Sequence, residues 1–224
     1  MSQDPKKRQK KLEQKKAKRK SKKQDIARKS GGGLVAEMKE AANCPIYECW
    51  RGDNMFETGM GQVLVSRKLP DGNIAVSVFL IDVYCLGVKD AFCSILGRFQ
   101  YSQKFAPHNM RYTPEPMEPA DARKLVEGAV AFARNCGLSA HPDYNKARLI
   151  FGDIKAEEST AEFEFGKDGK PYFVNGPHDS QTRCTQVISI LKNTLGEGNF
   201  DFTLMGPKVV GDALPAESVK QMEE

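Results

Sequence analysis

The stretch QVLVSRKLPDGNIAVSVFLIDVYC, residues 62–85, predicts two antiparallel strands joined by a tight turn. Residues 62–68 have the apolar and β-branched content of a strand, and residues 74–85 form a second, longer run of the same kind. Between them, residues 69–73 contain the Pro-Asp-Gly sequence of a turn. The centre of the second run is apolar on both faces, which is typical of a buried central strand. The hairpin therefore predicts a sheet at the centre of the fold.

Helical periodicity dominates much of the remaining sequence. Apolar residues recur at helical spacing in residues 34–42, 90–96, 121–137, 143–152 and 179–196. A second hairpin is predicted at residues 160–174, where two short apolar runs flank an Asp-Gly turn. Residues 46–51 and 200–204 predict further strands, and residues 101–119, with four prolines, predict an extended loop. This order favours an α+β fold, mainly an antiparallel sheet of two hairpins covered by helices.

Composition divides the chain into three parts. Residues 1–33 form a Lys-rich arm that ends in a glycine hinge, and we expect this arm to be disordered. Residues 34–207 are long enough for a single α+β domain with its own core, and residues 208–224 predict a flexible tail. No apolar stretch reaches the roughly 18–20 residues that span a bilayer, so no membrane partner is expected. The arm also lacks the apolar segment of a secretory signal.

The arm is strongly basic, whereas the rest of the chain is mildly acidic. Residues 1–30 hold 14 Lys and Arg against 3 Asp and Glu, a net charge of +11; the whole chain, with 34 and 29, carries +5, so residues 31–224 carry −6. Such a dense block of like charge repels itself and usually binds a polyanion. The candidate nucleic-acid-binding residues are Lys6, Lys7, Arg8, Lys10, Lys11, Lys15, Lys16, Lys18, Arg19, Lys20, Lys22 and Lys23.

The composition of the arm favours RNA or the ribosome as the partner, in the cytoplasm. Lysine suits sequence-independent contact with phosphates, and the arm has no aromatic residue on which bases could stack. If the source is eukaryotic, Lys6-Lys7-Arg8 and Lys18-Arg19-Lys20 also fit a nuclear localisation signal. Two alternatives remain open: a merely solubilising tail, and a protein-interaction module whose acidic body pairs with its own arm or with a basic partner.

Asp82 is the most unusual residue of the predicted domain, because it interrupts an apolar strand where a carboxylate is costly to bury. Lys89 and Asp90 follow near the same strand end, so the three are candidate catalytic residues. A strand carboxylate of this kind can hold Mg²⁺ in nucleases, but such a site needs two or three convergent carboxylates. No second one is suitably spaced. We therefore favour a structural Asp82 that is satisfied by Lys89, Arg67 or backbone N–H groups.

Two histidines stand next to carboxylates that could orient a general base. His141 precedes Asp143 by two residues, and His178 precedes Asp179 directly. Both aspartates, however, occupy positions where a helix N-cap is expected, and capping explains them without catalysis. A hydrolase or metal-dependent nuclease around Asp82 that recruits either histidine is the alternative function. A binding protein is the favoured class, and an enzyme the less favoured one.

The six cysteines predict neither disulfides nor a metal site. A cytosolic chain keeps its thiols reduced. Cys44 and Cys49 have a loose zinc-like spacing, but no matching second pair follows. A nucleophilic pair of Cys184 with a histidine is disfavoured, since this cysteine falls on the apolar stripe of its helix. We expect no cofactor, and we expect four cysteines to pack in the core: Cys85, Cys93, Cys136 and Cys184.

Overall fold

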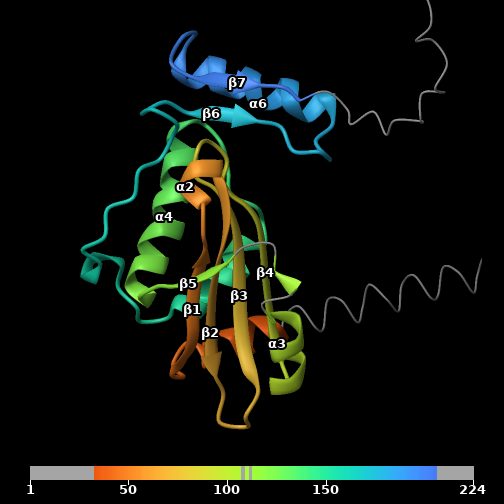
Figure 1. Ribbon diagram of the computed structural model, residues 1–224, viewed down its shortest axis with the longest axis vertical. Helices are drawn as coiled ribbons and strands as arrows, with labels where there is room; N and C mark the ends of the chain where they lie inside the picture. The colour runs from red at the N-terminus through yellow and green to blue at the C-terminus, as the bar shows by residue number, and fades with distance from the viewer. Residues whose placement is uncertain (1–32, 107–108, 111–112, 206–224) are drawn as a thin grey trace, which may run out of the picture.

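The computed structural model describes residues 33–106, 109–110 and 113–205 (Figure 1). The predicted arm lies outside these residues except for Gly33, which begins a helix of residues 33–41, and the predicted tail lies wholly outside them. The fold is α+β, as the sequence predicts, with a five-stranded antiparallel sheet and helices. No helix in the described part of the chain is both long and apolar enough to cross a bilayer.

The main sheet is built around the predicted hairpin. In spatial order its strands are β4 (Gly87–Leu96), β3 (Ile74–Asp82), β2 (Met60–Lys68), β1 (Ile46–Gly52) and β5 (Pro114–Pro116). Strands β2 and β3 pair without a register shift from Met60 opposite Asp82 to Lys68 opposite Ile74. Gly72 adopts a φ of +85° in the connecting turn, a conformation that a side chain would strain. The Pro-Asp-Gly sequence of residues 70–72 thus predicts the position of this turn correctly.

Residues 90–96 depart from the prediction, because they belong to strand β4 and not to a helix. The pairing with β3 places Cys93 opposite Ser77. Strand β3 needs hydrogen-bonding partners on both edges, and the long pairing with β4 outweighs the weak helical periodicity of a short segment. Asp90 therefore caps no helix; its Oδ1 instead accepts a hydrogen bond from the N–H of Ala91 at 2.8 Å.

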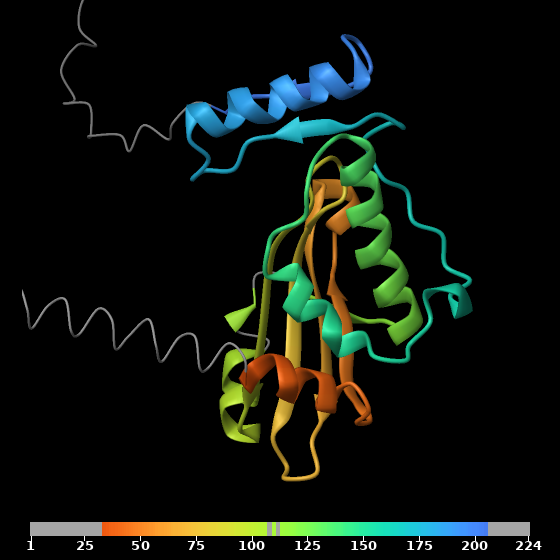
Figure 2. The ribbon, with the colours of Figure 1, turned by 180° about the vertical axis from the view of Figure 1, so that it is seen from behind.

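Most of the helices cover one face of the sheet (Figure 2). They are the helix of residues 33–41, α4 (Pro119–Asn135), α5 (Tyr144–Ala147) and the 3₁₀ helix η2 (Arg148–Phe151). Between these layers Phe79 of β3 stacks on Phe151, with ring centroids 5.5 Å apart. Helix α4 is confirmed: Leu125 and Ala129 lie on its predicted apolar stripe and are fully buried. Two further short helices are α2 (Met55–Thr58) and the 3₁₀ helix η3 (Ala156–Glu158).

The opposite face is partly covered by α3 (Arg98–Lys104), which the sequence does not predict. The expected loop of residues 101–119 begins inside this helix and also contains β5. Tyr101 anchors the helix on the sheet in a cluster with Trp50 and Leu64. Its hydroxyl donates a hydrogen bond to Glu48 Oε2 at 2.8 Å. Because Tyr101 is the helix's only buried residue, no apolar periodicity marks it in the sequence.

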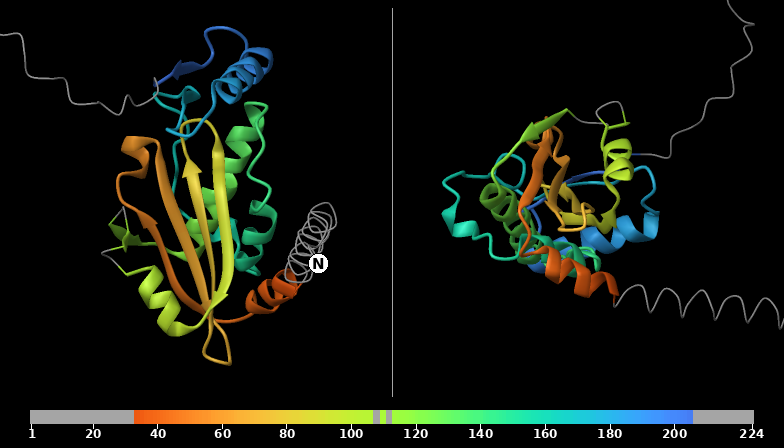
Figure 3. Two further views of the ribbon diagram at one scale, coloured as in Figure 1. Left: turned by 90° about the vertical axis from the view of Figure 1, so that its right-hand side faces the viewer. Right: turned by 90° about the horizontal axis from the view of Figure 1, so that it is seen from below.

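The C-terminal part forms a small unit of β6 (Tyr172–Val174), α6 (Gln181–Leu195) and β7 (Asp201–Thr203). It lies across the end of the main sheet opposite the β2–β3 turn (Figure 3). Strands β6 and β7 pair in parallel, with α6 as the crossover between them. Strand β7 confirms the predicted strand at residues 200–204. A second core joins this unit to α4 through Phe173, Leu191 and Ala133.

The predicted second hairpin is wrong, although its turn exists. Lys167 donates its N–H to the carbonyl of Lys170 at 2.7 Å, as an Asp-Gly turn should. Residues 160–165, however, form no strand. Phe163 stacks on Phe56 at 6.0 Å, and Phe165 of the same segment packs against α4. These aromatic anchors hold the segment against helices, so β6 takes β7 as its partner.

Candidate functional site

The basic residues Lys6 to Lys23 of the predicted nucleic-acid interface lie outside the described residues. The candidate residues of the predicted domain, residues 34–207, which we call the body, lie within the described part of the chain. Lys89 and Asp90 lie on β4, Asp82 ends β3, and His141 lies in the loop between α4 and α5. His178, in the loop before α6, is exposed.

Asp82 is buried and serves the turn that connects β3 to β4. Its Oδ1 accepts hydrogen bonds from the N–H groups of Tyr84 at 3.0 Å and Cys85 at 2.9 Å. Burial raises the pKa of Asp82 to about 6, while these backbone hydrogen bonds and the charge of Lys89 oppose the rise. A carboxylate at this position can therefore be explained by the turn that it organises.

The raised pKa of Asp82 predicts a pH-dependent stability difference. The folded state binds the Asp82 proton more tightly than the unfolded state, so this residue's contribution to stability falls as pH rises through about 4 to 6. Asp82→Asn keeps an acceptor oxygen but removes the titration. We compare the unfolding free energy of the variant with that of the unsubstituted protein at each pH. We expect this difference, variant minus unsubstituted, to be about 2 kcal/mol larger at pH 7.5 than at pH 4.5, so that the variant is relatively more stable at the higher pH. Urea unfolding at both pH values measures this; a pH-independent difference would contradict it.

Lys89 and His141 converge on a cavity between β4, residues 138–142 and the start of α6. The cavity has a volume of about 380 Å³, and Asp179 and Arg183 also line it. Lys89 Nζ lies 3.3 Å from Asp179 Oδ2, and this carboxylate also accepts the N–H of Gly176 at 2.7 Å. The loop before α6 is thus fastened to β4 across the cavity.

Neither predicted cap makes a capping hydrogen bond. Asp143 occupies the N-cap position of α5, but its carboxylate binds Lys146 at 3.1 Å. The N-cap of α6 is Ser180, whose side chain accepts the N–H of Arg183. Burial opposes ionisation of Asp179, but the Gly176 N–H and the neighbouring cations outweigh it and lower the pKa of its carboxyl. The charged carboxylate of Asp179 therefore forms the ion pair with Lys89 and does not cap helix α6.

His141 is held mainly by backbone contacts. Its N–H donates to the carbonyl of Val88 on β4 at 2.9 Å, which fixes the loop to the edge of the sheet. Its Nδ1 accepts the N–H of Asp143 at 3.3 Å and lies 3.8 Å from Asp90 Oδ1. The ring therefore sits between the first cavity and a second one.

The second cavity, of about 230 Å³, adjoins the first through residues 138–141, which line both. Arg134 of α4 and Arg148 of η2 line it, together with Asn145. Neither arginine has a carboxylate within 4.0 Å in the described ranges. We call the two cavities together the cationic cleft, lined by Lys89, Arg134, His141, Arg148, Asp179 and Arg183.

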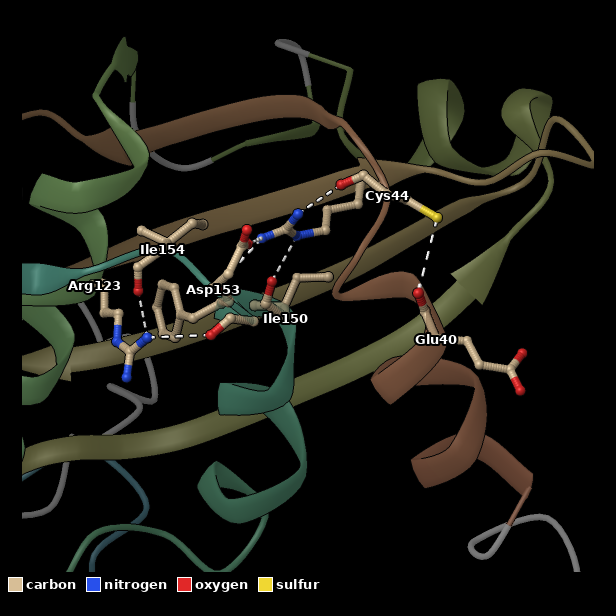
Figure 4. Close-up of polar contacts among 9 residues, drawn as sticks. Glu40, Cys44, Arg123, Ile150, Asp153 and Ile154 are labelled. Atoms are coloured by element: carbon tan, nitrogen blue, oxygen red, sulfur yellow. Dashed lines mark hydrogen bonds and ion pairs between the residues drawn. The ribbon is translucent and has the colours of Figure 1, made fainter.

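Arg67 supports this cleft from the core. Its buried guanidinium group donates to the carbonyls of Ile150 at 2.7 Å, Phe151 at 2.9 Å and Cys44 at 2.6 Å. Figure 4 shows Cys44, Ile150 and Asp153 around this group. The two η2 carbonyls belong to the short helix that carries Arg148. Arg67 thus fixes η2 against β2 and with it one wall of the cleft.

The candidate catalytic residues do not all meet in the cationic cleft. Asp82 and His178 do not line the cleft. Among the described residues no three His, Cys, Asp or Glu side chains gather as a metal site would require. The thiol of Cys184 is buried on α6. Four cations and one carboxylate line the cleft; the carboxylate, of Asp179, lies within 4.0 Å of Lys89 and Arg183.

Sequence reasoning finds Lys89 and His141 but misses three of the four cleft cations. Arg134, Arg148 and Arg183 come from separate helices that meet only after the C-terminal unit packs on the sheet. Comparisons with protein-family models, with curated proteins and with solved structures find no match.

Proposed function

We propose that the protein binds RNA, and that the Lys-rich arm supplies most of the affinity. The observation that carries this proposal is the charge division, with +11 on residues 1–30 and −6 on residues 31–224. A polyanion is attracted by the first part and repelled by the net charge of the second. Binding through the arm therefore explains why the basicity is confined to one end.

The composition of the arm supports structured or ribosomal RNA in the cytoplasm as the ligand. Residues 1–30 contain 11 lysines and 3 arginines. Lysine acts as a point charge toward phosphate, whereas bidentate reading of bases uses arginine. We infer that the arm follows the phosphate backbone and carries little sequence preference itself.

The cationic cleft supports a phosphate contact on the body. Arg134 and Arg148 have no ion-pair partner in the described part of the chain, so a phosphate would not have to displace a carboxylate. Asn145 and Ser139 add neutral hydrogen-bonding groups to the same wall. One phosphate of an RNA held by the arm would fit these groups.

The test is a salt titration of the RNA binding constant for the full chain and for a chain that lacks residues 1–30. The proposal expects the shortened chain to bind far more weakly at low salt. Equal affinities of the two chains at low salt would contradict it.

The cleft contact predicts a smaller, separate effect. We expect the double substitution Arg134→Ala with Arg148→Ala to weaken RNA binding by roughly tenfold and to lower the salt slope by about one. Both side chains are exposed and neither has an ion-pair partner among the described residues, so the thermal stability should change little. Fluorescence anisotropy at several salt concentrations measures both quantities.

Lys155→Ala is the matched control, because this lysine is exposed, pairs loosely with Glu158 at 3.8 Å and does not line the cleft. Loss of one such surface cation should leave the affinity within about twofold. If the loss for each removed cation is the same in the control and in the double variant, the effect belongs to net charge and the cleft is removed from the proposal.

A further inference from the structure

Two phenylalanine rings are exposed on the face of the sheet that carries α3. Phe99 of α3 is 74% exposed, and Phe92 of β4 is 40% exposed. Single exposed apolar residues are common on protein surfaces. Here, however, one cation, Lys104, lies over the Phe92 ring and lines a surface hollow together with Phe99.

Lys104 is this cation. Its Nζ lies 3.8 Å from the centroid of the Phe92 ring, and its side chain lines the same surface hollow as Phe99. Helix α3 also carries Arg98 and contains no acidic residue. Neither cation has a carboxylate within 4.0 Å among the residues that the structure describes. The helix is thus locally basic on a body that is acidic overall.

The hollow has a volume of about 710 Å³, which is within the range of sites for small organic groups. Gln100 and Gln103 of α3 line it beside Phe99. The amide of Gln100 is engaged by the N–H of Gly97 at 3.3 Å. Gln103 accepts a hydrogen bond from the side-chain amide of Asn109 at its backbone carbonyl, at 2.8 Å, and no side-chain hydrogen bond of Gln103 occurs among the described residues. An aromatic face, a primary amide and an ammonium group therefore meet in one place.

These three groups match the parts of a nucleotide. A base stacks on an aromatic face, its edge hydrogen-bonds to an amide, and its phosphate pairs with lysine. Stacking of this kind requires an unpaired base, because duplex RNA keeps its bases inside the helix. The position also suits the arm: α3 and the helix of residues 33–41 lie at the same end of the sheet, on opposite faces (Figures 1 and 3).

We propose that Phe92, Phe99 and Lys104, called here the aromatic platform, bind unpaired bases of the RNA that the arm holds. This inference rests on the proposed function and adds to it the class of RNA recognised: a single-stranded segment beside the arm's binding site. The arm supplies affinity for phosphates of any RNA, and the platform supplies a preference for single strands.

The test compares two RNA probes on the full chain. One is a single-stranded 12-mer of mixed sequence that contains 2-aminopurine, and the other is the blunt duplex of the same sequence. We expect Phe99→Ala to weaken single-strand binding by about tenfold and to leave duplex binding unchanged. Addition of the unsubstituted protein should also change the 2-aminopurine fluorescence of the single strand, and Phe99→Trp should preserve that change.

Phe202→Ala is the matched control, since this ring is 47% exposed on β7 at the far end of the molecule. It should leave the affinity for both probes unchanged. Equal single-strand affinity of Phe99→Ala and the unsubstituted chain would overturn the platform, and so would equal losses for both probes. Removal of residues 1–30 tests the arm separately, because its loss should weaken both probes alike.

Discussion

Deletion of residues 1–30 is expected to weaken RNA binding by about a hundredfold or more at 50 mM salt and to remove most of its salt dependence. Each neutralised phosphate releases bound counterions, and about 6–10 such contacts make affinity fall by roughly 10³–10⁵ between 50 and 200 mM salt. The arm carries 14 cations, enough for that number of contacts, whereas the body carries a net charge of −6. The slope of log affinity against log salt measures the effect directly.

Two variants of the arm separate charge from sequence. A chain with the residues of the arm in shuffled order keeps the same charge, so we expect its affinity and slope to stay within about threefold of the original. A chain with every arm lysine replaced by glutamine keeps the length but should behave like the deletion. If the shuffled arm fails to bind, the contact depends on sequence and the charge-based mechanism is wrong.

Sequence reasoning succeeds where a local signal and the tertiary partner agree. The β2–β3 hairpin has an apolar run on each side of a Pro-Asp-Gly turn, and helix α4 has an apolar stripe that meets the sheet. Sequence reasoning fails where a distant pairing partner determines the secondary structure of a segment. Residues 90–96 have weak helical spacing, yet an unpaired edge of β3 makes them a strand. Residues 171–174 follow a good hairpin turn, yet they pair with β7 across α6.

The candidate site shows the same division between local and tertiary information. Asp82 attracts notice because a carboxylate in an apolar strand needs a partner, and its partners are the backbone N–H groups of its own turn. Arg134 and Arg148 do not stand out in the sequence, because a solvent-facing arginine on a helix is ordinary. Their meaning depends on which helices pack together, and periodicity within one helix does not specify that packing.

The largest effect on stability is expected at Arg67, whose side chain is almost completely buried on β2. It holds three backbone carbonyls from two distant segments, those of Cys44, Ile150 and Phe151. Arg67→Met fills a similar volume but provides no donor, so these carbonyls lose their charged partner inside the protein. Each unsatisfied buried group costs about 1–3 kcal/mol, and we expect a total loss of about 3–5 kcal/mol in unfolding free energy.

Two matched substitutions decide whether burial causes the Arg67 effect. Arg123 also donates hydrogen bonds to two backbone carbonyls, those of Gly152 and Ile154, which follow η2 in the chain. Its side chain is more exposed than that of Arg67. Arg123→Met should cost about 1 kcal/mol, because water can replace its hydrogen bonds. Arg148→Met, which removes an arginine without an ion-pair partner in the described residues, should change stability by less than about 0.5 kcal/mol. Urea unfolding ranks the three variants, and a loss below about 1 kcal/mol for Arg67→Met would show that η2 is held by its apolar contacts. Because η2 carries Arg148, an Arg67 variant that remains folded should also lose the cleft's contribution to RNA binding while keeping that of the arm.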